Sequence, residues 1–302
     1  MAPTIDIVRH AQALHNIQGS HIKDPELTSQ GLLECQQLRN QYQFGDKVTH
    51  ILSSPLKRAI TTALVGIIPA VDPRIKVQLL PALQEINGSP SSTGLPKSEL
   101  ATHYAGDQNR VDMSLLTEDW YRKGSGTLYA PTVSSVYERA RAARVFLWRL
   151  ARRAMEAGDD DAHIVVVTHG EFAHWLTGDF RGVMVARNTN WGNAEVRSYR
   201  LKGINADMPD DPQLVETTKS ISTRGLPAAH ISVSAGDLQI IRRIAEGRVM
   251  AYNEQLSIQE AAAKTSPSNN SPEGSDGSDS FEKIQHSDGS DEWVDVEDEC
   301  DF

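Results

Sequence analysis

The chain has 302 residues, of which 39% are hydrophobic and 23% are charged, a balance typical of globular proteins. No segment approaches the ~18 uninterrupted apolar residues of a transmembrane helix. The N-terminus also lacks the basic segment and apolar run of a secretory signal. The two cysteines, Cys35 and Cys300, are too few for a disulfide framework or a four-cysteine zinc site. We therefore expect a cytoplasmic protein in a reducing compartment, without membrane contact.

The net charge of −10 is distributed unevenly along the chain. Residues 265–302 contain 12 acidic residues and one basic residue, Lys283, whereas residues 1–264 carry a net charge of +1. No basic stripe marks a nucleic-acid-binding surface, so nucleic acid is not an expected partner. The Ser, Asp, Glu and Gly content of residues 265–302 predicts a disordered acidic tail.

In the first half of the chain, short β-rich runs alternate with helical patterns. The runs predict strands at residues 4–8, 50–55 and 77–80. Apolar spacing predicts helices at residues 31–43 and 57–68, the first capped by Thr28 and the second closed by Pro69. A segment rich in Gly, Ser and Pro predicts a loop at residues 87–98.

The second half continues the alternation. Residues 133–157 form the clearest helical pattern, and we expect its arginines to lie on a solvated face: Arg139, Arg141, Arg144, Arg149, Arg152 and Arg153. Residues 163–168 are a fully apolar run, typical of a buried parallel strand, and a helix should follow. We expect a last strand at residues 196–201 and a long helix at residues 235–263.

This alternation predicts the α/β fold class, with a mostly parallel sheet covered by helices on both faces. We expect three regions along the chain. Residues 1–202 form the α/β core, residues 203–264 form a C-terminal extension with the long helix, and residues 265–302 form the disordered tail.

Two histidines follow predicted strands, His10 after the first and His169 after the strand at residues 163–168. Ligands of such sheets bind at the carboxyl ends of the strands. Arg9 and Arg58 add guanidinium groups that suit phosphate oxygens, and the N-termini of the helices that follow the strands add backbone N–H donors. A neutral imidazole is a nucleophile, and Glu85, after the third strand, is a candidate proton donor.

Five sequence blocks occur in the order typical of one family. They are Arg9-His10-Ala11-Gln12 with Asn16, Leu27-Thr28-x-x-Gly31, Ser53-Ser54-Pro55-Leu56-x-Arg58-Ala59-x-x-Thr62, Leu83-Gln84-Glu85 and Val167-Thr168-His169-Gly170. In this set the chain resembles the histidine phosphatase (phosphoglycerate mutase-like) superfamily over residues 5–201. The block Trp191-Gly192-Asn193-x-Glu195-x-Arg197-Ser198-Tyr199 is similar to fungal phosphoglycerate mutase-like proteins.

The resemblance implies a three-layer α/β/α sandwich and a metal-independent phosphomonoester hydrolase with no cofactor. His10 would be the nucleophile that carries a phosphohistidine, and Glu85 would protonate the leaving oxygen and then activate water. The phosphate would be held by Arg9, Asn16, Arg58, His169 and Gly170. The substrate would be a small phosphorylated molecule.

Two positions depart from the family pattern. Ala11 stands where the family usually has glycine, and alanine is the smallest replacement. Ser92 stands where fungal relatives often have an acidic residue, which bears on substrate preference.

Two other functions remain open. A mutase would use the same phosphohistidine, although the run after His10 lacks the Gly-Glu-Ser-x-Trp-Asn of glycolytic mutases. A scaffold would keep the fold without turnover, which the intact set of histidines, arginines and Glu85 disfavours.

Several residues near the motifs have two interpretations. Asn16 either contacts phosphate or caps a turn. His15, His21, His174 and Glu171 either line the substrate pocket or are ordinary surface residues, and Asn193 and Glu195 are candidates for structural roles. A metal site at His10 and His169 is disfavoured because no carboxylate stands at a familiar ligand spacing.

The tail contains two aromatic–aliphatic pairs among acidic residues, Phe281 with Ile284 and Trp293 with Val296. They resemble the short motif that binds ubiquitin-like autophagy proteins by β-augmentation. The alternative interpretation is a solubilising acidic tail.

Overall fold

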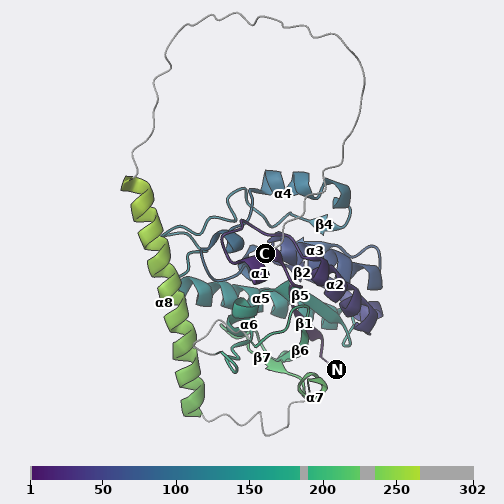
Figure 1. Ribbon diagram of the computed structural model, residues 1–302. Helices are drawn as coiled ribbons and strands as arrows, with labels where there is room; N and C mark the ends of the chain where they lie inside the picture. Colours follow the sequence, from purple (N-terminus) through teal and green to yellow (C-terminus); the bar gives the residue numbers. More distant parts are fainter. Residues whose placement is uncertain (1, 184–189, 225–234, 266–302) are drawn as a thin grey trace, which may run out of the picture. The chain divides into compact units, whose positions relative to one another are not determined.

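One mixed sheet forms the centre of the computed structural model, which describes residues 2–183, 190–224 and 235–265. Within these residues, seven strands pair in the order β4-β3-β2-β5-β1-β6-β7 (Figure 1). Strands β1 to β5 pair in parallel, β6 pairs antiparallel with β1, and β7 pairs antiparallel with β6. The bounds are Thr4–Arg9 (β1), Val48–Ser53 (β2), Val77–Leu79 (β3), Val111–Asp112 (β4), His163–Thr168 (β5), Val196–Leu201 (β6) and Leu214–Glu216 (β7).

Helices flank this sheet on both faces (Figure 1). The α-helices are Leu14–Gln18 (α1), Ser29–Gln41 (α2), Lys57–Gly66 (α3), Lys97–His103 (α4), Val133–Glu156 (α5), Gly170–Thr177 (α6), Thr218–Thr223 (α7) and Ala235–Thr265 (α8). Short 3-10 helices occur at Gly45–Lys47, Ile68–Ala70, Pro81–Leu83, Pro90–Ser92 and Ala105–Asp107.

The central strands supply two separate hydrophobic cores. Because side chains alternate along a strand, Ile7 and Val166 pack on one face, while Val8 and Val167 pack on the other. The first core includes buried residues of α5, α6 and α8, and the second includes residues of α2, α3 and α4. The structure thus confirms the predicted three-layer α/β/α fold class.

The start of α2 is fixed by the residues that the sequence singled out. Thr28 accepts a hydrogen bond from the Gly31 backbone N–H at 3.0 Å, so it is the predicted N-cap. A Cβ atom at position 31 would lie 2.0 Å from the carbonyl oxygen of Gln12. Glycine is therefore required for α2 to approach the loop that follows His10.

The sequence patterns did not predict four of the short elements. Strands β4 and β7 have two and three residues, and α1 and α7 have five and six. Such elements are too short to show a period of 2.0 or 3.6 residues. The predicted loop at residues 87–98 contains a 3-10 turn, and α4 begins at Lys97.

The expectation that all arginines of α5 are solvated is wrong for two of them. Arg139 is 1% exposed and donates to the carbonyl oxygens of Ala82 and Gln84 at 3.1 and 2.8 Å. Arg144 is 4% exposed and pairs with Asp211 at 2.6 Å. Carbonyl and carboxylate acceptors offset the cost of burying these guanidinium groups.

Helix α8 packs against the α5 and α6 face. Ala245 and Val249 are buried in the first core, and the Leu256 side chain faces the position where a Cβ atom on Gly88 would lie. The 3.5 Å approach of Leu256 to a Cβ built on Gly88 is an ordinary van der Waals distance. The long helix of the C-terminal extension is therefore tied to the α/β core.

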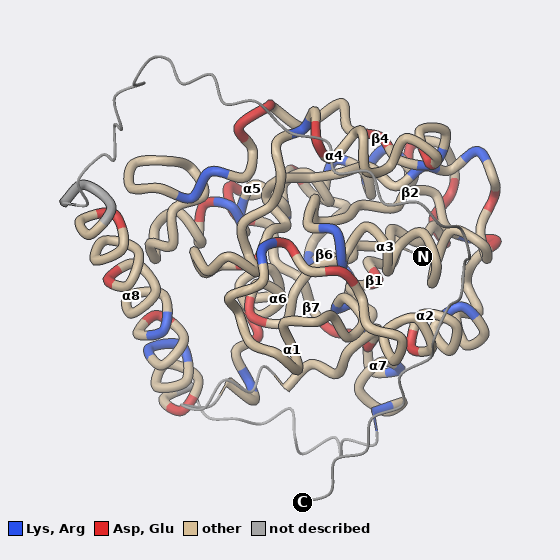
Figure 2. Tube along the Cα trace, turned by 45° about the horizontal axis from the view of Figure 1, so that its top comes forward, with Lys and Arg blue, Asp and Glu red and all other residues tan. Residues whose placement is uncertain are grey.

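The chain divides into two units, Met1–Lys264 and Thr265–Phe302. The tail predictions, including both aromatic–aliphatic pairs, lie outside the described residues. Figure 2 shows Lys and Arg interspersed with Asp and Glu along α8 and the neighbouring loops, and the described trace shows no continuous basic stripe. Among the described helices, none has the length and apolar character needed to cross a membrane.

Candidate active site

Three neighbouring strands bring the predicted site together. Strands β2, β5 and β1 are adjacent and parallel, so Ser54, His169 and His10 follow their carboxyl ends at one edge of the sheet. The backbone N–H of His10 donates to Thr168 at 2.9 Å. The rings of His10 and His169 lie 5.2 Å apart between centroids, so two histidines separated by 159 positions share one site.

His10 is held as a neutral imidazole with one nitrogen available. It is 2% exposed, and its Nδ1 lies 2.7 Å from the carbonyl oxygen of Ala11. Since a carbonyl only accepts, Nδ1 carries the proton and Nε2 keeps its lone pair. Burial, followed by the charges of Arg58 and Arg9, lowers the pKa of His10 well below its ordinary value. These conditions suit a nucleophile.

His169 is fully buried beside it and is held by a serine. Its Nε2 lies 2.7 Å from the Oγ of Ser54, while its Nδ1 has no hydrogen-bond partner in the described part of the chain. Burial, then the charge of Arg58, lowers the pKa of His169 well below its ordinary value. The free Nδ1 is therefore a second neutral group available to a ligand.

Arg58 is buried and Arg9 is half-buried, and the hydrogen-bonding groups of both are only partly satisfied. Arg9 donates through Nη1 to the carbonyl oxygen of Trp191, and Arg58 donates through Nη1 to that of Ser91 at 2.6 Å. The Nε atoms of Arg9 and Arg58 have no partner among the described residues. Burial lowers the pKa of Arg58 to about 10, so its guanidinium still carries its charge at neutral pH.

Glu85 lies at the same end of the sheet, after the 3-10 turn that follows β3. It is 9% exposed, and its Oε1 accepts from the backbone N–H groups of Ile86 and Phe172 at 2.9 and 3.1 Å. The Phe172 N–H belongs to the first turn of α6, whose first residue is Gly170. The start of α6 therefore orients the predicted proton donor. His169 is the N-cap of this helix and Gly170 is its first residue.

The segment after residue 190 supports His10 from the other side. Asn193 donates through Nδ2 to the carbonyl oxygen of His10 at 3.1 Å. The carbonyl of Glu195 accepts from the Arg9 backbone N–H at 3.1 Å, and its carboxylate pairs with Arg197 at 2.6 Å. Asn193 and Glu195 thus have the structural roles that one interpretation of the sequence gave them.

The other candidates lie at different distances from the histidine pair. Asn16 is exposed, and its Oδ1 accepts from the Ala13 N–H at 2.9 Å, as in the turn-capping interpretation. The ring of His15 lies 5.5 Å from that of His10, and its buried Nδ1 has no partner within the described ranges. Burial lowers the pKa of His15 to about 3, so it too is neutral.

His21 and His174 do not join this group. His21 is exposed, whereas His174 is buried and its Nδ1 lies 2.5 Å from the carbonyl oxygen of Asp179. Ser92 is 2% exposed in the 3-10 turn beside Arg58. Glu171 is buried and faces α8, where it accepts from Arg248 and Tyr252 at 3.1 and 3.0 Å.

Sequence reasoning missed two buried charges near the site. Asp24 is 0% exposed, caps α3 by accepting from the Lys57 N–H at 3.0 Å, and has a pKa raised to about 7 by burial. Lys123 is 4% exposed and donates to the carbonyl oxygens of Glu85 and Asn87 at 2.6 and 2.9 Å. Asp24 stands three positions before the Leu27-Thr28 block, and this nearness to a family block was the sequence signal that could have found it. Lys123 lies in an irregular segment with no such block beside it.

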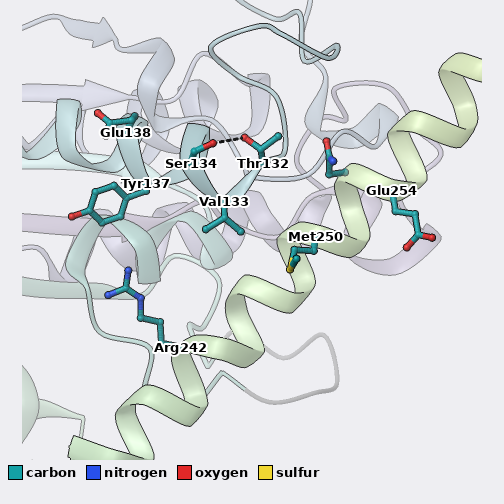
Figure 3. A pocket seen from close by; sticks show the side chains of 9 residues that line it. Thr132, Val133, Ser134, Tyr137, Glu138, Arg242, Met250 and Glu254 are labelled. Carbon is teal, nitrogen blue, oxygen red and sulfur yellow. Dashed lines mark hydrogen bonds between the residues drawn. The ribbon is translucent and has the colours of Figure 1, made fainter.

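A separate cavity of about 790 Å³ lies between the start of α5 and α8 (Figure 3). Thr132, the N-cap of α5, and Ser134 in its first turn line the cavity on one side, and Arg242, Met250 and Glu254 line it from α8. None of the predicted site residues lines it. The described residues also contain no group of three or more His, Cys, Asp or Glu side chains arranged to hold a metal ion.

Chemically, the site combines a neutral imidazole nucleophile with buried polar nitrogens that lack hydrogen-bond partners. Arg9, Arg58, His15 and His169 each have a buried nitrogen without a partner in the part of the chain described. Unpaired buried donors are costly, so they indicate a ligand that supplies several acceptors at once. A tetrahedral oxyanion such as phosphate has this property.

The chain is similar to known proteins in both sequence and fold. Residues 5–207 match the family described as the histidine phosphatase superfamily (branch 1). A search of curated proteins gave no match.

Solved structures similar to this chain include ecdysone phosphate phosphatase from Bombix mori in complex with tungstate. It has 18% identity and a TM-score of 0.48, and the alignment covers 72% of this chain and 96% of that one. A mycobacterial glucosyl-3-phosphoglycerate phosphatase in complex with VO3 has 20% identity, coverages of 72% and 98%, and a TM-score of 0.44. Phosphoserine phosphatase from Entamoeba histolytica has 17% identity, coverages of 72% and 97%, and a TM-score of 0.42.

Proposed function

Because the chain belongs to the histidine phosphatase superfamily (branch 1), we propose that it is a metal-independent phosphomonoester hydrolase that acts through a phosphohistidine at His10. Its substrate is a small phosphorylated metabolite. The observation that carries this proposal is the neutral, buried His10 surrounded by donors without acceptors on Arg9, Arg58 and His169.

In the first step, Nε2 of His10 attacks phosphorus and the bond from phosphorus to the leaving oxygen breaks. The Ala11 carbonyl, 2.7 Å from Nδ1, stabilises the positive charge that develops on the ring. Arg9, Arg58 and His169 donate to the non-bridging oxygens, which carry the charge of the transition state. Glu85, as the acid, transfers a proton to the leaving oxygen.

In the second step, Glu85 accepts a proton from water as the water oxygen attacks phosphorus. The phosphorus–nitrogen bond breaks, inorganic phosphate forms and His10 returns to its neutral state. The same carboxyl thus acts first as acid and then as base, which requires it to stay beside the site in both steps. Its Oε1 is fixed by the N–H groups of Ile86 and Phe172, which supports this double role.

The sequence of the run that follows His10 favours hydrolysis over the mutase reaction. That run, Ala11-Gln12-Ala13-Leu14-His15-Asn16, differs from the Gly-Glu-Ser-x-Trp-Asn of glycolytic mutases. A mutase needs a bisphosphate primer and releases little free phosphate, so a phosphate assay separates the two reactions.

The first prediction is that phosphate release depends on His10. Wild-type protein with a chelator and no added metal should release phosphate from an aryl phosphate, and His10→Ala should lower the rate roughly 1,000-fold or more, because the nucleophile is lost. His21→Ala, which changes an exposed histidine, is the matched control and should leave the rate unchanged.

Two results would contradict the proposal. One is equal phosphate release by wild type and His10→Ala. The other is release that appears only with added metal. Transfer to a second substrate with a bisphosphate primer, without free phosphate, would instead support the mutase.

A further inference from the structure

Ser54 contacts the site without a role in the mechanism above. It follows β2 directly, and both Ser54 and His169 are 0% exposed. The Oγ of Ser54 lies 2.7 Å from Nε2 of His169, across 115 positions of sequence. The backbone N–H of Ser54 donates to Val167 at 2.9 Å, so β5 fixes the position of the serine relative to the histidine.

The proton on the Ser54 hydroxyl can be placed by counting donors and acceptors. The Oγ already accepts from the Leu56 N–H at 3.3 Å, so its own proton still needs an acceptor. In the described part of the chain, Nε2 of His169 is the one acceptor within hydrogen-bond distance of that proton. If the hydroxyl donates to Nε2, the imidazole proton must be on Nδ1.

This arrangement matches what a bound phosphoryl group needs from His169. The Nδ1 atom is buried and has no partner among the described residues, so it is the nitrogen that remains for a ligand. Phosphoryl oxygens only accept hydrogen bonds, so a lone pair on Nδ1 would repel them and a proton on Nδ1 would bind them. The useful tautomer is therefore the one that a Ser54 donor selects.

We propose that Ser54 is a positioning residue that fixes the Nδ1–H tautomer and the ring orientation of His169, so that His169 donates to the transferring phosphoryl group. The inference rests on the proposed function for its catalytic consequence. Its statement about the tautomer concerns the resting protein and is measurable without turnover.

The tautomer is tested by nitrogen NMR of protein labelled with ¹⁵N-histidine at neutral pH. His169→Gln identifies the His169 signals by their loss. Wild-type His169 should carry its proton on Nδ1, and Ser54→Ala should move a measurable fraction of the population to the Nε2–H tautomer. A proton on Nε2 in the wild-type protein would overturn the inference, and this readout does not depend on how well the variant folds.

The kinetic consequence is tested with the same variants. Ser54→Ala should lower kcat about 10- to 100-fold with a smaller change in KM, because His169 is lost as a donor to the transition state. Ser54→Thr keeps the hydroxyl and should restore both the Nδ1–H tautomer and most of kcat. An unchanged kcat in Ser54→Ala, or a Thr variant with the Nδ1–H tautomer and the kcat of the Ala variant, would contradict the catalytic part.

The two proposals fail in different ways. Absence of phosphate release by wild type, together with a proton on Nδ1 of His169, would refute the phosphatase and leave the effect of Ser54 on the tautomer intact. Phosphate release that depends on His10, together with a proton on Nε2 of His169, would refute the role of Ser54 alone.

Discussion

At the scale of single residues, burial decides the chemistry of the candidate site. His10 and His169 are both almost completely buried and lie near the charge of Arg58. Burial and the nearby positive charge both favour the neutral imidazole. The same burial acts in the opposite direction on acids and raises the pKa of Asp24 and of Glu171 to about 7. The two histidines of the site therefore stay neutral at pH values where a free histidine would be protonated, and Asp24 and Glu171, outside the histidine pair, ionise near pH 7.

These shifts predict an acidic pH range for activity. Because the pKa of free His10 lies well below 6.5, the value of kcat/KM should not fall at pH 6.5 but only at a clearly lower pH. Above pH 7, Asp24 and Glu171 lose protons, and the added negative charge should oppose binding of an anionic substrate.

The check is the pH dependence of kcat/KM, corrected for ionisation of the substrate. Asp24→Asn and Glu171→Gln remove the two titrations near pH 7, and each should move the alkaline decline to higher pH. A loss of activity centred at pH 6.5 or above on the acidic side would contradict a depressed pKa for His10.

At the scale of elements, α8 is tied to the core through a few contacts at its centre. Val249 is 0% exposed and Ala245 is 5% exposed, whereas the neighbouring Met250 is 65% exposed. Arg248 and Tyr252, on the same side of the helix, donate to Glu171 in the first turn of α6. The C-terminal extension thus contacts the helix that starts directly after His169.

A charge at the centre of this contact should release α8. Val249→Asp places an unpaired carboxylate in an apolar site. Keeping α8 docked would then cost at least about 3 kcal/mol, so we expect the helix to leave the core. Hydrogen exchange of the α8 amides should become much faster, while exchange in β1 and β5 should change little.

The exposed neighbour provides the matched control. Met250→Asp adds the same charge one position along and should leave exchange in α8 unchanged, since that side chain is mostly in solvent. Equal protection of α8 in wild type and Val249→Asp would show that the helix does not depend on this contact.

At the scale of the whole molecule, the site links parts of the chain that are far apart. Strands β1, β2 and β5 each end at the site, and Glu85 follows β3 at the same end of the sheet. Asn193 and Glu195 hydrogen-bond to the backbone of His10 and Arg9. An oxyanion bound to donors from all these segments would stabilise the folded state as a whole, because the unfolded chain cannot bind it. Several unpaired donors without an oxyanion are correspondingly a cost to stability.

Orthovanadate should therefore raise the melting temperature of the protein. At a concentration about 100-fold above its Kd, a ligand adds ~2.7 kcal/mol of stability, or roughly 5 °C or more for a domain of this size. Arg58→Met should abolish most of the shift, because it removes a buried donor of the site. Arg39→Met alters an exposed arginine on α2 and should keep it. A shift of the same size in Arg58→Met would place the anion elsewhere.

The bounds of the three predicted regions and the cytoplasmic location stay predictions. The binding of ubiquitin-like autophagy proteins by the acidic tail is also a prediction. Truncation after Lys264 removes the entire net negative charge of the chain, since residues 265–302 carry a net charge of −11 and residues 1–264 carry +1. Binding that persists after this truncation would exclude the tail motifs.

The sequence by itself determined the fold class, the family and the positions of His10, Arg58 and His169. The fold class and the two histidines depend on local signals, since apolar runs mark buried strands and a polar side chain directly after such a strand lies at its carboxyl end. Arg58 and the family depend on the ordered sequence blocks, because Arg58 lies inside α3, after β2 has ended. Tertiary structure alone decided which arginines of α5 are buried, because Arg139 needs carbonyl acceptors from residues 82 and 84 that no helical pattern reveals. It also decided the pairs of Ser54 with His169 and Lys123 with Glu85, since hydrogen bonds between residues far apart in sequence exist only once the strands have chosen their order in the sheet.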